Sequence, residues 1–236
     1  MKNLSILLSA ALMIIFTSCE KVVGEGGLIN ETRTTGSFAG VESELSANIA
    51  YEQGNDYKVE LTAQQNILNV IETPVLNNEL VVRFKNNVRV KSHEHITIKV
   101  TAPSISSVGL SGSGNVDVLS PLSANDLSLR ISGSGNIVAP SVSCSHLGVN
   151  ISGTGNISIN AGVADNENLK ISGSGGIDVR NVVAKSVTTT TSGSGNMKVN
   201  VSENLNVTIS GSGSVYYWGT PVVNTKISGS GKVIHQ

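Results

Sequence analysis

The residues best suited to metal chemistry are the two histidines of His93-Glu94-His95. Side chains two positions apart on a strand share a face, so the two imidazoles could together ligate a zinc ion. The apolar residues of the following strand, which begin at Ile96, occupy even-numbered positions and are expected to point inward. His93 and His95 occupy odd-numbered positions, so we expect both imidazoles to face solvent. No third ligand is evident nearby, and we predict no metal site.

Paired carboxylates are the groups that would cleave a polysaccharide. Asp117 and Asp178 occupy equivalent positions of a sequence repeat, but three repeats apart, which corresponds to about 14 Å in stacked strands. That separation is too large for a paired-carboxylate mechanism. Calcium binding is also disfavoured, because the repeated glycine-rich phrase contains no acidic residue. We therefore predict a protein with no catalytic residues and no cofactor.

Cys19 is the candidate for covalent lipid attachment. Lys2 precedes a 13-residue apolar run from Leu4 to Phe16, which is too short to span a bilayer and is typical of a signal peptide. The run ends in a segment that resembles the bacterial lipobox, which predicts a signal peptide over 1–18, lipidation of Cys19 and a location in the outer membrane. The alternative is an ordinary secretory signal with a coincidental cysteine. Cys144 would have no disulfide partner, and we expect it to be a small buried side chain.

Tyr216-Tyr217-Trp218 is the only aromatic cluster in a chain with 3% aromatic residues. Strand alternation predicts that Tyr217 points inward and that Tyr216 and Trp218 point outward. An exposed aromatic pair of this kind could form a cap or an oligomer contact. It could also be a platform that binds a sugar or a partner protein.

The elements that must position these residues are set by a repeat. The phrase Ser-Gly-Ser/Thr-Gly, in most copies followed by Asn, recurs seven times at intervals of 18 to 21 residues. Its copies begin at Ser111, Ser132, Ser152, Ser172, Ser192, Ser210 and Ser228. Apolar residues alternate with polar ones on both sides of each copy, which is typical of strands with one buried face. A fixed period near 20 residues predicts an all-β solenoid, a parallel β-helix with one repeat per coil over 109–236.

Stacking of the coils predicts ladders of equivalent side chains. One apolar ladder comprises Leu110, Ile131, Ile151, Ile171, Thr191, Ile209 and Ile227, and a second comprises Val116, Ile137, Ile157, Ile177, Met197, Val215 and Val233. A polar ladder comprises Asn115, Asn136, Asn156 and Asn196. Stacked amides can hydrogen-bond to one another along a corner, and a ligand-binding row is the alternative.

The residues before the repeats are expected to form a less regular end of the same fold. We interpret 19–27 as a flexible tether, because it is polar and rich in glycine. Short alternating runs indicate a β-rich part over 28–108, with one possible helical turn between Asn66 and Ile71. This part should be continuous with the solenoid and cover its first coil, since an uncovered end would expose unpaired backbone groups.

Composition narrows the choice of partners. A formal net charge of −1 provides no basic field for nucleic acid or an anionic membrane surface. We expect the protein to contact the membrane only through the lipid at Cys19. Possible further partners are a host or envelope protein, a glycan, or a second copy of the chain.

The repeat Ile-Ser-Gly-Ser-Gly-Asn-Ile behind a lipobox resembles the bacterial GIN-domain family of auto-transporter adhesin heads. The segments Gly36–Val41 and Asn66–Thr73 also look like that family, so the resemblance extends over 36–236. It implies a right-handed, single-stranded parallel β-helix and an adhesin-like function. We accordingly expect a non-enzymatic, lipid-anchored envelope protein with an interaction role. The alternatives are a carbohydrate-binding or polysaccharide-processing β-helix and a purely structural envelope component.

Overall fold

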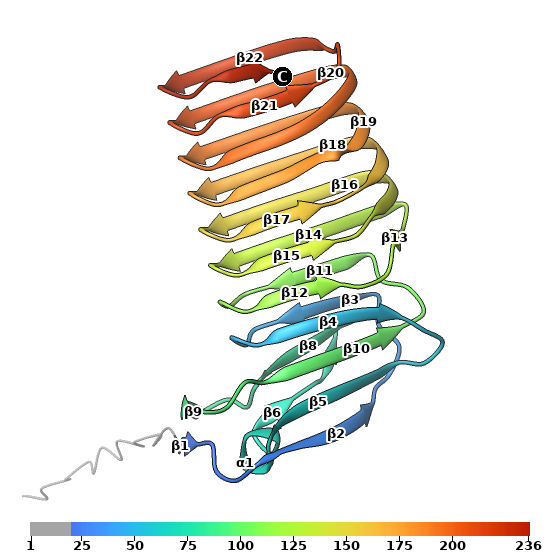
Figure 1. Ribbon diagram of the computed structural model, residues 1–236, viewed down its shortest axis with the longest axis vertical. Coiled ribbons are helices and arrows are strands. Elements are labelled where there is room, and N and C mark those ends of the chain that lie inside the picture. The colour runs from blue at the N-terminus through green and yellow to red at the C-terminus, as the bar shows by residue number, and fades with distance from the viewer. Residues whose placement is uncertain (1–19) are drawn as a thin grey trace, which may run out of the picture.

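The computed structural model describes residues 20–236, so the predicted signal peptide and Cys19 lie outside the described residues. The chain forms a parallel β-solenoid of about six turns, with about 20 residues per coil, standing on a less regular β-rich part (Figure 1). The predicted fold class is confirmed. Residues 20–236 contain no helix that is both long and apolar enough to cross a membrane.

The N-terminal part contains ten strands and one helical turn. They are β1 (Glu20–Val23), β2 (Leu28–Thr34), β3 (Gly40–Ser43), β4 (Asn48–Gln53), β5 (Lys58–Gln64), α1 (Gln65–Leu68), β6 (Ile71–Glu72), β7 (Val75–Leu76), β8 (Glu79–Phe84), β9 (Val88–Ser92) and β10 (Thr97–Ala102). The helical turn overlaps the region 66–71 where one was expected, and it begins one residue earlier. Strand β10 pairs in parallel with β4 and antiparallel with β5, which in turn pairs with β2. These mixed pairings extend the solenoid sheet and cover its lower end.

The interpretation of 19–27 as a flexible tether is wrong for residues 20–23. These residues form β1, which pairs in parallel with β9, and Glu20 N donates a 2.9 Å hydrogen bond to Asn87 O. Val22 is 9% exposed and joins the core, whereas Val23 is 45% exposed. The two valines thus alternate between a buried and an exposed position, as side chains of a strand with one buried face do. The chain is therefore part of the fold from Glu20 onward.

The solenoid contains thirteen strands. They are β11 (Ser107–Leu110), β12 (Asn115–Val118), β13 (Leu122–Ser123), β14 (Asp126–Gly133), β15 (Asn136–Ala139), β16 (Val142–Gly153), β17 (Asn156–Ile159), β18 (Gly162–Gly173), β19 (Gly176–Gly193), β20 (Asn196–Gly211), β21 (Val215–Trp218), β22 (Val222–Gly229) and β23 (Val233–His235). In each coil one segment runs toward the Ser-Gly phrase and one runs away from it. We call the outer surfaces formed by these segments the inbound face and the outbound face.

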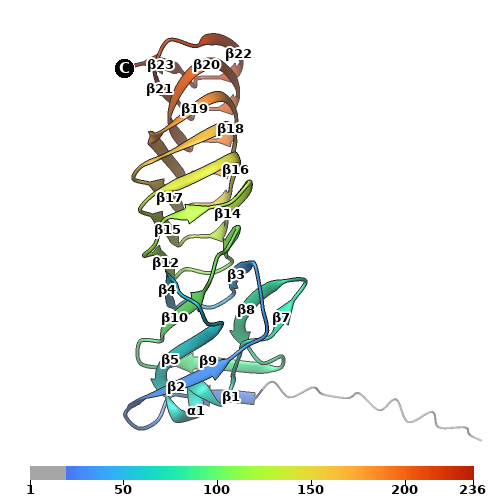
Figure 2. The same cartoon turned by 90° about the vertical axis from the view of Figure 1, so that its right-hand side faces the viewer.

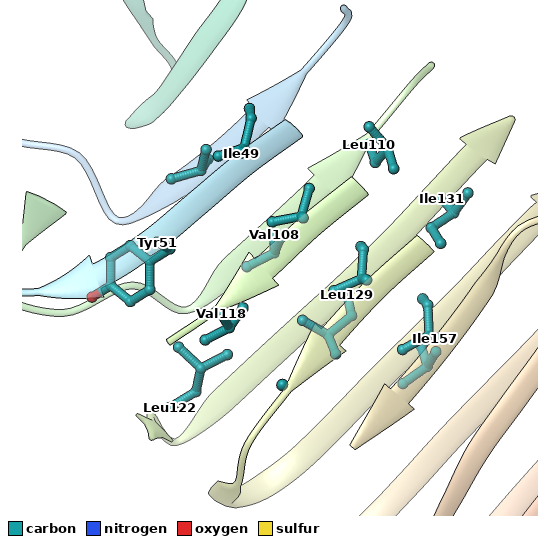
Figure 3. Packing of buried hydrophobic residues seen from close by; sticks show 14 of the residues in the cluster. Ile49, Tyr51, Val108, Leu110, Val118, Leu122, Leu129, Ile131 and Ile157 are labelled. Carbon is teal, nitrogen blue, oxygen red and sulfur yellow. The ribbon is translucent and has the colours of Figure 1, made fainter. Parts of the chain in front are cut away.

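Both predicted apolar ladders are confirmed. Equivalent positions pair in parallel register from coil to coil, as Ile131 does with Ile151 and Ile151 with Ile171. All members are buried except those of the last coil, where Ile227 is 43% exposed and Val233 is half-buried. Figure 3 shows this packing at the lower end of the stack. The core is thus a thin column of aliphatic side chains that runs the length of the rod.

One coil of the stack is made from residues that precede the repeats. Strands β3 and β4 lie between the β8/β10 level below and the β11/β12 level above. Residues 43–48 (Ser-Glu-Leu-Ser-Ala-Asn) take the place that Leu-Ser-Gly-Ser-Gly-Asn takes at 110–115. Asn48 and Ile49 thereby pair with Asn115 and Val116. The N-terminal part is continuous with the solenoid, as expected, but this coil is inserted out of chain order.

The Ser-Gly phrase forms a corner that requires glycine at its first glycine position. Gly153 has a φ of +137°, and a Cβ there would lie 2.2 Å from the carbonyl oxygen of Gly133 in the coil below. That oxygen accepts hydrogen bonds of 3.0 and 3.2 Å from the amides of Thr154 and Gly155. Close approach of the backbones therefore excludes any side chain at this position.

Candidate functional site

The asparagine ladder forms a hydrogen-bonded stack at the start of the outbound face. The amide of Asn136 donates to Asn115 over 2.9 Å, and Asn156 donates to Asn136 over 3.0 Å. Asn48 extends the stack downward by accepting a 3.2 Å bond from Asn115. Gly176 interrupts the row, and above it Asn196 accepts from a backbone amide instead, that of Ser214, over 2.9 Å. The stacked amides thus bind one another along the corner.

Higher on the outbound face, the aromatic residues of β21 lie next to charged ones. Val215 is fully buried, and Tyr217 packs against the core and against His235, with 4.9 Å between ring centroids. Tyr216 and Trp218 are half-buried. The guanidinium of Arg180 lies 5.6 Å from the centroid of the Trp218 ring, which is a cation–π contact.

Arg180 belongs to an ion network that crosses two coils. Its Nε donates to Asp178 Oδ1 over 2.9 Å, and its Nη2 bonds to the other oxygen of the same carboxylate. Lys198 Nζ lies 3.3 Å from Asp178 Oδ2. Burial by itself would raise the pKa of Asp178, but the hydrogen bonds from Arg180 and the positive charges of both neighbours outweigh it and hold the pKa below its usual value. The carboxylate is therefore ionised at neutral pH.

Together these side chains form one continuous feature, which we call the distal platform: Asp178, Arg180, Lys198, Tyr216 and Trp218. Strand register places Lys198 between Asp178 and Tyr216, and all five residues lie on the outbound side of β19, β20 and β21. The sequence singled out Tyr216 and Trp218 and placed Asp178 at a recurring position of the repeat. Arg180 was missed, because it lies two residues beyond Asp178, where no repeat signal marks it.

The inbound face carries a shallow hollow at Gly148. Its volume is about 520 Å³, and polar side chains line it, including Asp126, Ser128, His146, Asn168 and Thr188. A Cβ on Gly148 would have no neighbour closer than 3.8 Å. The backbone therefore does not require this glycine, and its effect is to leave a gap in the column of side chains.

Glu167 is the most unusual titratable residue of the solenoid. It occupies an apolar ladder position between Leu147 and Val187, is 2% exposed, and has no hydrogen-bond partner for either carboxyl oxygen within residues 20–236. Burial raises its pKa to about 8. The sequence contains a signal for this burial that was missed: Glu167 lies two and four residues before Leu169 and Ile171, and side chains at this spacing on a strand point to the same side. The carboxyl is sealed from solvent and cannot reach a substrate.

The other candidates remain separate from one another. His93 and His95 are exposed, and nowhere in residues 20–236 do three potential metal-binding side chains gather in one place. Register keeps Asp117 and Asp178 three coils apart, as predicted. The expectation that Cys144 is buried is met only in part, because the side chain packs against the core but is half-buried and lines a hollow of about 640 Å³.

The reason for the difference at Cys144 is a change of phase at a bend. Cys144 and Ser145 are both half-buried, so inward and outward side chains do not alternate there. Partial burial raises the pKa of the Cys144 thiol to about 11, and the nearby charges of Glu167 and Asp165 act in the same direction. The thiol is therefore protonated and weakly nucleophilic at neutral pH.

These observations define a parallel β-solenoid protein with polar, repetitive outer faces. Residues 37–221 match the family model "Putative auto-transporter adhesin, head GIN domain", and the chain belongs to that family. A search of curated proteins returned no match to the chain.

Solved structures with the same fold come from Bacteroides and Parabacteroides species. A "putative adhesin" from Bacteroides fragilis is 23% identical, with a TM-score of 0.83, over 91% of this chain and 100% of that one. A "putative adhesin" from Parabacteroides merdae is 24% identical, with a TM-score of 0.76, over 92% and 99%. A "Putative lipid binding protein" from Parabacteroides distasonis is 22% identical, with a TM-score of 0.78, over 92% and 100%. At these identities the likeness establishes the fold.

Proposed function

We propose that this protein is a lipid-anchored, non-enzymatic adhesin-like protein of the bacterial envelope, held at the outer membrane through Cys19. The observation that carries the proposal is the separation of the two ends of the rod. Strand β1 lies at the base of the N-terminal part, and the last coil, β22 and β23, lies at the opposite end of the stack (Figure 2). Cys19 directly precedes β1 in the chain.

An anchor at this position would hold the base of the rod at the membrane. Because β1 is paired with β9 and not part of a loose tether, the lipid would be close to the folded part. Coils stacked at about 4.8 Å place the seventh repeat roughly 30 Å above the first. The distal coils would then be the part of the molecule most accessible to a partner, which is the geometry that an adhesin head needs.

The surface chemistry supports binding in preference to catalysis. One column of the inbound face consists of Ser128, Gly148, Asn168, Thr188, Asn206 and Asn224, so it offers hydroxyl and amide groups at regular intervals. Such groups form many weak, directional contacts with a polar ligand. The side chain of Glu167 is buried, and the thiol of Cys144, with a pKa of about 11, is protonated at neutral pH, so neither group offers an accessible base or nucleophile. Membership of an adhesin-head family agrees with this interpretation.

A binding screen tests the proposal. The soluble form, residues 20–236, is applied to an array of glycans and of host and envelope proteins. We expect saturable binding to at least one ligand class, and mass spectrometry of the bound ligand should show it unchanged after prolonged incubation. Cleavage or modification of the ligand would contradict the non-enzymatic role. No binding to any class would contradict the adhesin-like role.

A further inference from the structure

We propose that the distal platform is a binding site for an acidic saccharide, a sugar that carries a carboxylate or sulfate group. This inference rests on the proposed adhesin-like function and assigns a partner class and a site to it. The platform combines two partly exposed aromatic rings with a cationic ion network on adjacent coils.

The aromatic rings supply the surface on which a sugar ring can lie. Tyr216 and Trp218 come from one strand, β21, at positions two apart, so both project from the same side of the sheet. Both are half-buried, so each ring is fixed by its neighbours and still reaches solvent. Sugars present apolar C–H faces that pack on such rings, while the phenol and indole offer polar groups at the edge.

The charges of the platform select an anion. Arg180 and Lys198 carry two positive charges and Asp178 one negative charge, which leaves an excess of one positive charge. The carboxylate of Asp178 accepts hydrogen bonds from Nε and Nη2 of Arg180, whereas Nη1 donates to no group within residues 20–236. A guanidinium fixed by a carboxylate on one edge and by an indole ring has its other edge available for a carboxylate or sulfate.

The same charges argue against a second copy of the chain at this site. In a two-fold symmetric contact the same patch lies on both sides of the interface, so two platforms of excess positive charge would face each other. Like charges placed together in this way disfavour association. An acidic saccharide instead neutralises the excess charge and covers the rings.

The position of the platform fits a ligand-binding role. Its residues lie on β19, β20 and β21, in the part of the stack remote from β1 and next to the last coil, β22 and β23 (Figure 1). A ligand bound there would not contact the N-terminal part.

Trp218 allows a direct test, because it is the only tryptophan of the chain and its fluorescence reports on the site without a label. Residues 20–236 are titrated with trigalacturonate and, separately, with neutral maltotriose. We expect a saturable change in Trp218 emission with trigalacturonate at a concentration at least tenfold below any change with maltotriose. Raising the salt concentration from 0.05 to 0.5 M should weaken the binding of trigalacturonate severalfold, because salt screens the attraction between opposite charges.

Variants locate the site by calorimetry. Trp218→Ala and Lys198→Gln should each weaken trigalacturonate binding at least tenfold, and Lys170→Gln, which removes an exposed lysine of the inbound face, should leave it unchanged. Circular dichroism checks that each variant is folded. Equal binding by Trp218→Ala and the wild type, or no binding of trigalacturonate, would overturn the inference.

Two further results separate this inference from its alternatives. A wild type that binds no acidic sugar but forms a dimer that Trp218→Ala abolishes would assign the platform to self-association and overturn the inference. If the array detects a ligand whose binding is unaffected by Trp218→Ala and Lys198→Gln, the adhesin-like function stands and the assignment to the platform fails.

Discussion

Replacing Glu167 by glutamine should remove most of the pH dependence of stability between pH 5.5 and 8. The buried carboxyl has a pKa of about 8 in the folded chain, against an ordinary value of 4.5. In that interval the folded state keeps the proton and the unfolded state releases it. The stability contribution is therefore fully present below pH 4.5 and is lost as the pH rises through 8.

The size of the effect follows from the linkage relation. Each pH unit between the two pKa values changes the free energy of unfolding by about 1.4 kcal/mol, so the wild type should lose on the order of 3 kcal/mol from pH 5.5 to 8. Glu167→Gln cannot ionise and should show a much flatter profile. Carboxylates with lowered pKa values, such as Asp165 and Asp178, titrate below this interval. The thiol of Cys144, with a pKa of about 11, titrates above it.

Urea unfolding at several pH values, followed by circular dichroism, measures this directly. The difference between the two proteins isolates Glu167, because every other titratable group is common to both. Glu167→Leu is a second variant, which places an apolar side chain between Leu147 and Val187. It should raise stability at pH 7 by roughly 2 kcal/mol, because an unpaired buried carboxyl is removed. Parallel pH profiles for the wild type and Glu167→Gln would refute the reasoning.

Three further perturbations test the fold and the anchor. Gly153→Ala should destabilise the chain by about 2 kcal/mol or more in urea unfolding, because its φ is +137° and the added Cβ would lie 2.2 Å from a carbonyl oxygen. Gly148→Ala should change stability by less than about 0.5 kcal/mol, because the nearest atom to an added Cβ is 3.8 Å away. Equal effects of Gly153→Ala and Gly148→Ala would contradict the corner geometry. Ile171→Asp should lower the free energy of unfolding by at least about 3 kcal/mol, because it buries an unpaired charge. Lys170→Asp, at an exposed position, should have little effect. Similar melting curves for the two variants would show that the assigned strand register is wrong. Cys19→Ala should abolish incorporation of labelled palmitate, and continued labelling would exclude lipidation at this site.

Sequence reasoning could predict the fold because its signals are local and repeated. The phrase that ends in Asn136 and Asn156 sets the corner, and alternation around Ile151 and Ile171 sets the buried face. Each coil repeats both signals, so errors at a single position do not change the result. The period near 20 residues then determines which strands are neighbours, without any further information.

What sequence reasoning missed depends on pairing between distant or unrepeated segments. Asn48 joins the asparagine stack because β4 is inserted below β12, and no periodicity connects residue 48 with residue 115. Glu20–Val23 becomes a strand through its pairing with β9, which is 68 residues away at Glu20 and Val88. Arg180 reaches Trp218 through a long side chain across two coils, a contact set by rotamers and not by backbone register.

The most direct test of the central proposal measures adhesion by intact cells. Cells that carry the full-length chain, its Cys19→Ala variant or no copy are passed over a surface coated with mucin, whose saccharides carry carboxylate and sulfate groups. Retention should be highest for the wild type and should fall to the level of the deletion strain for Cys19→Ala, although the variant chain is still made. Equal retention of all three strains, with the wild-type chain confirmed at the cell surface, would contradict a lipid-anchored adhesin-like function.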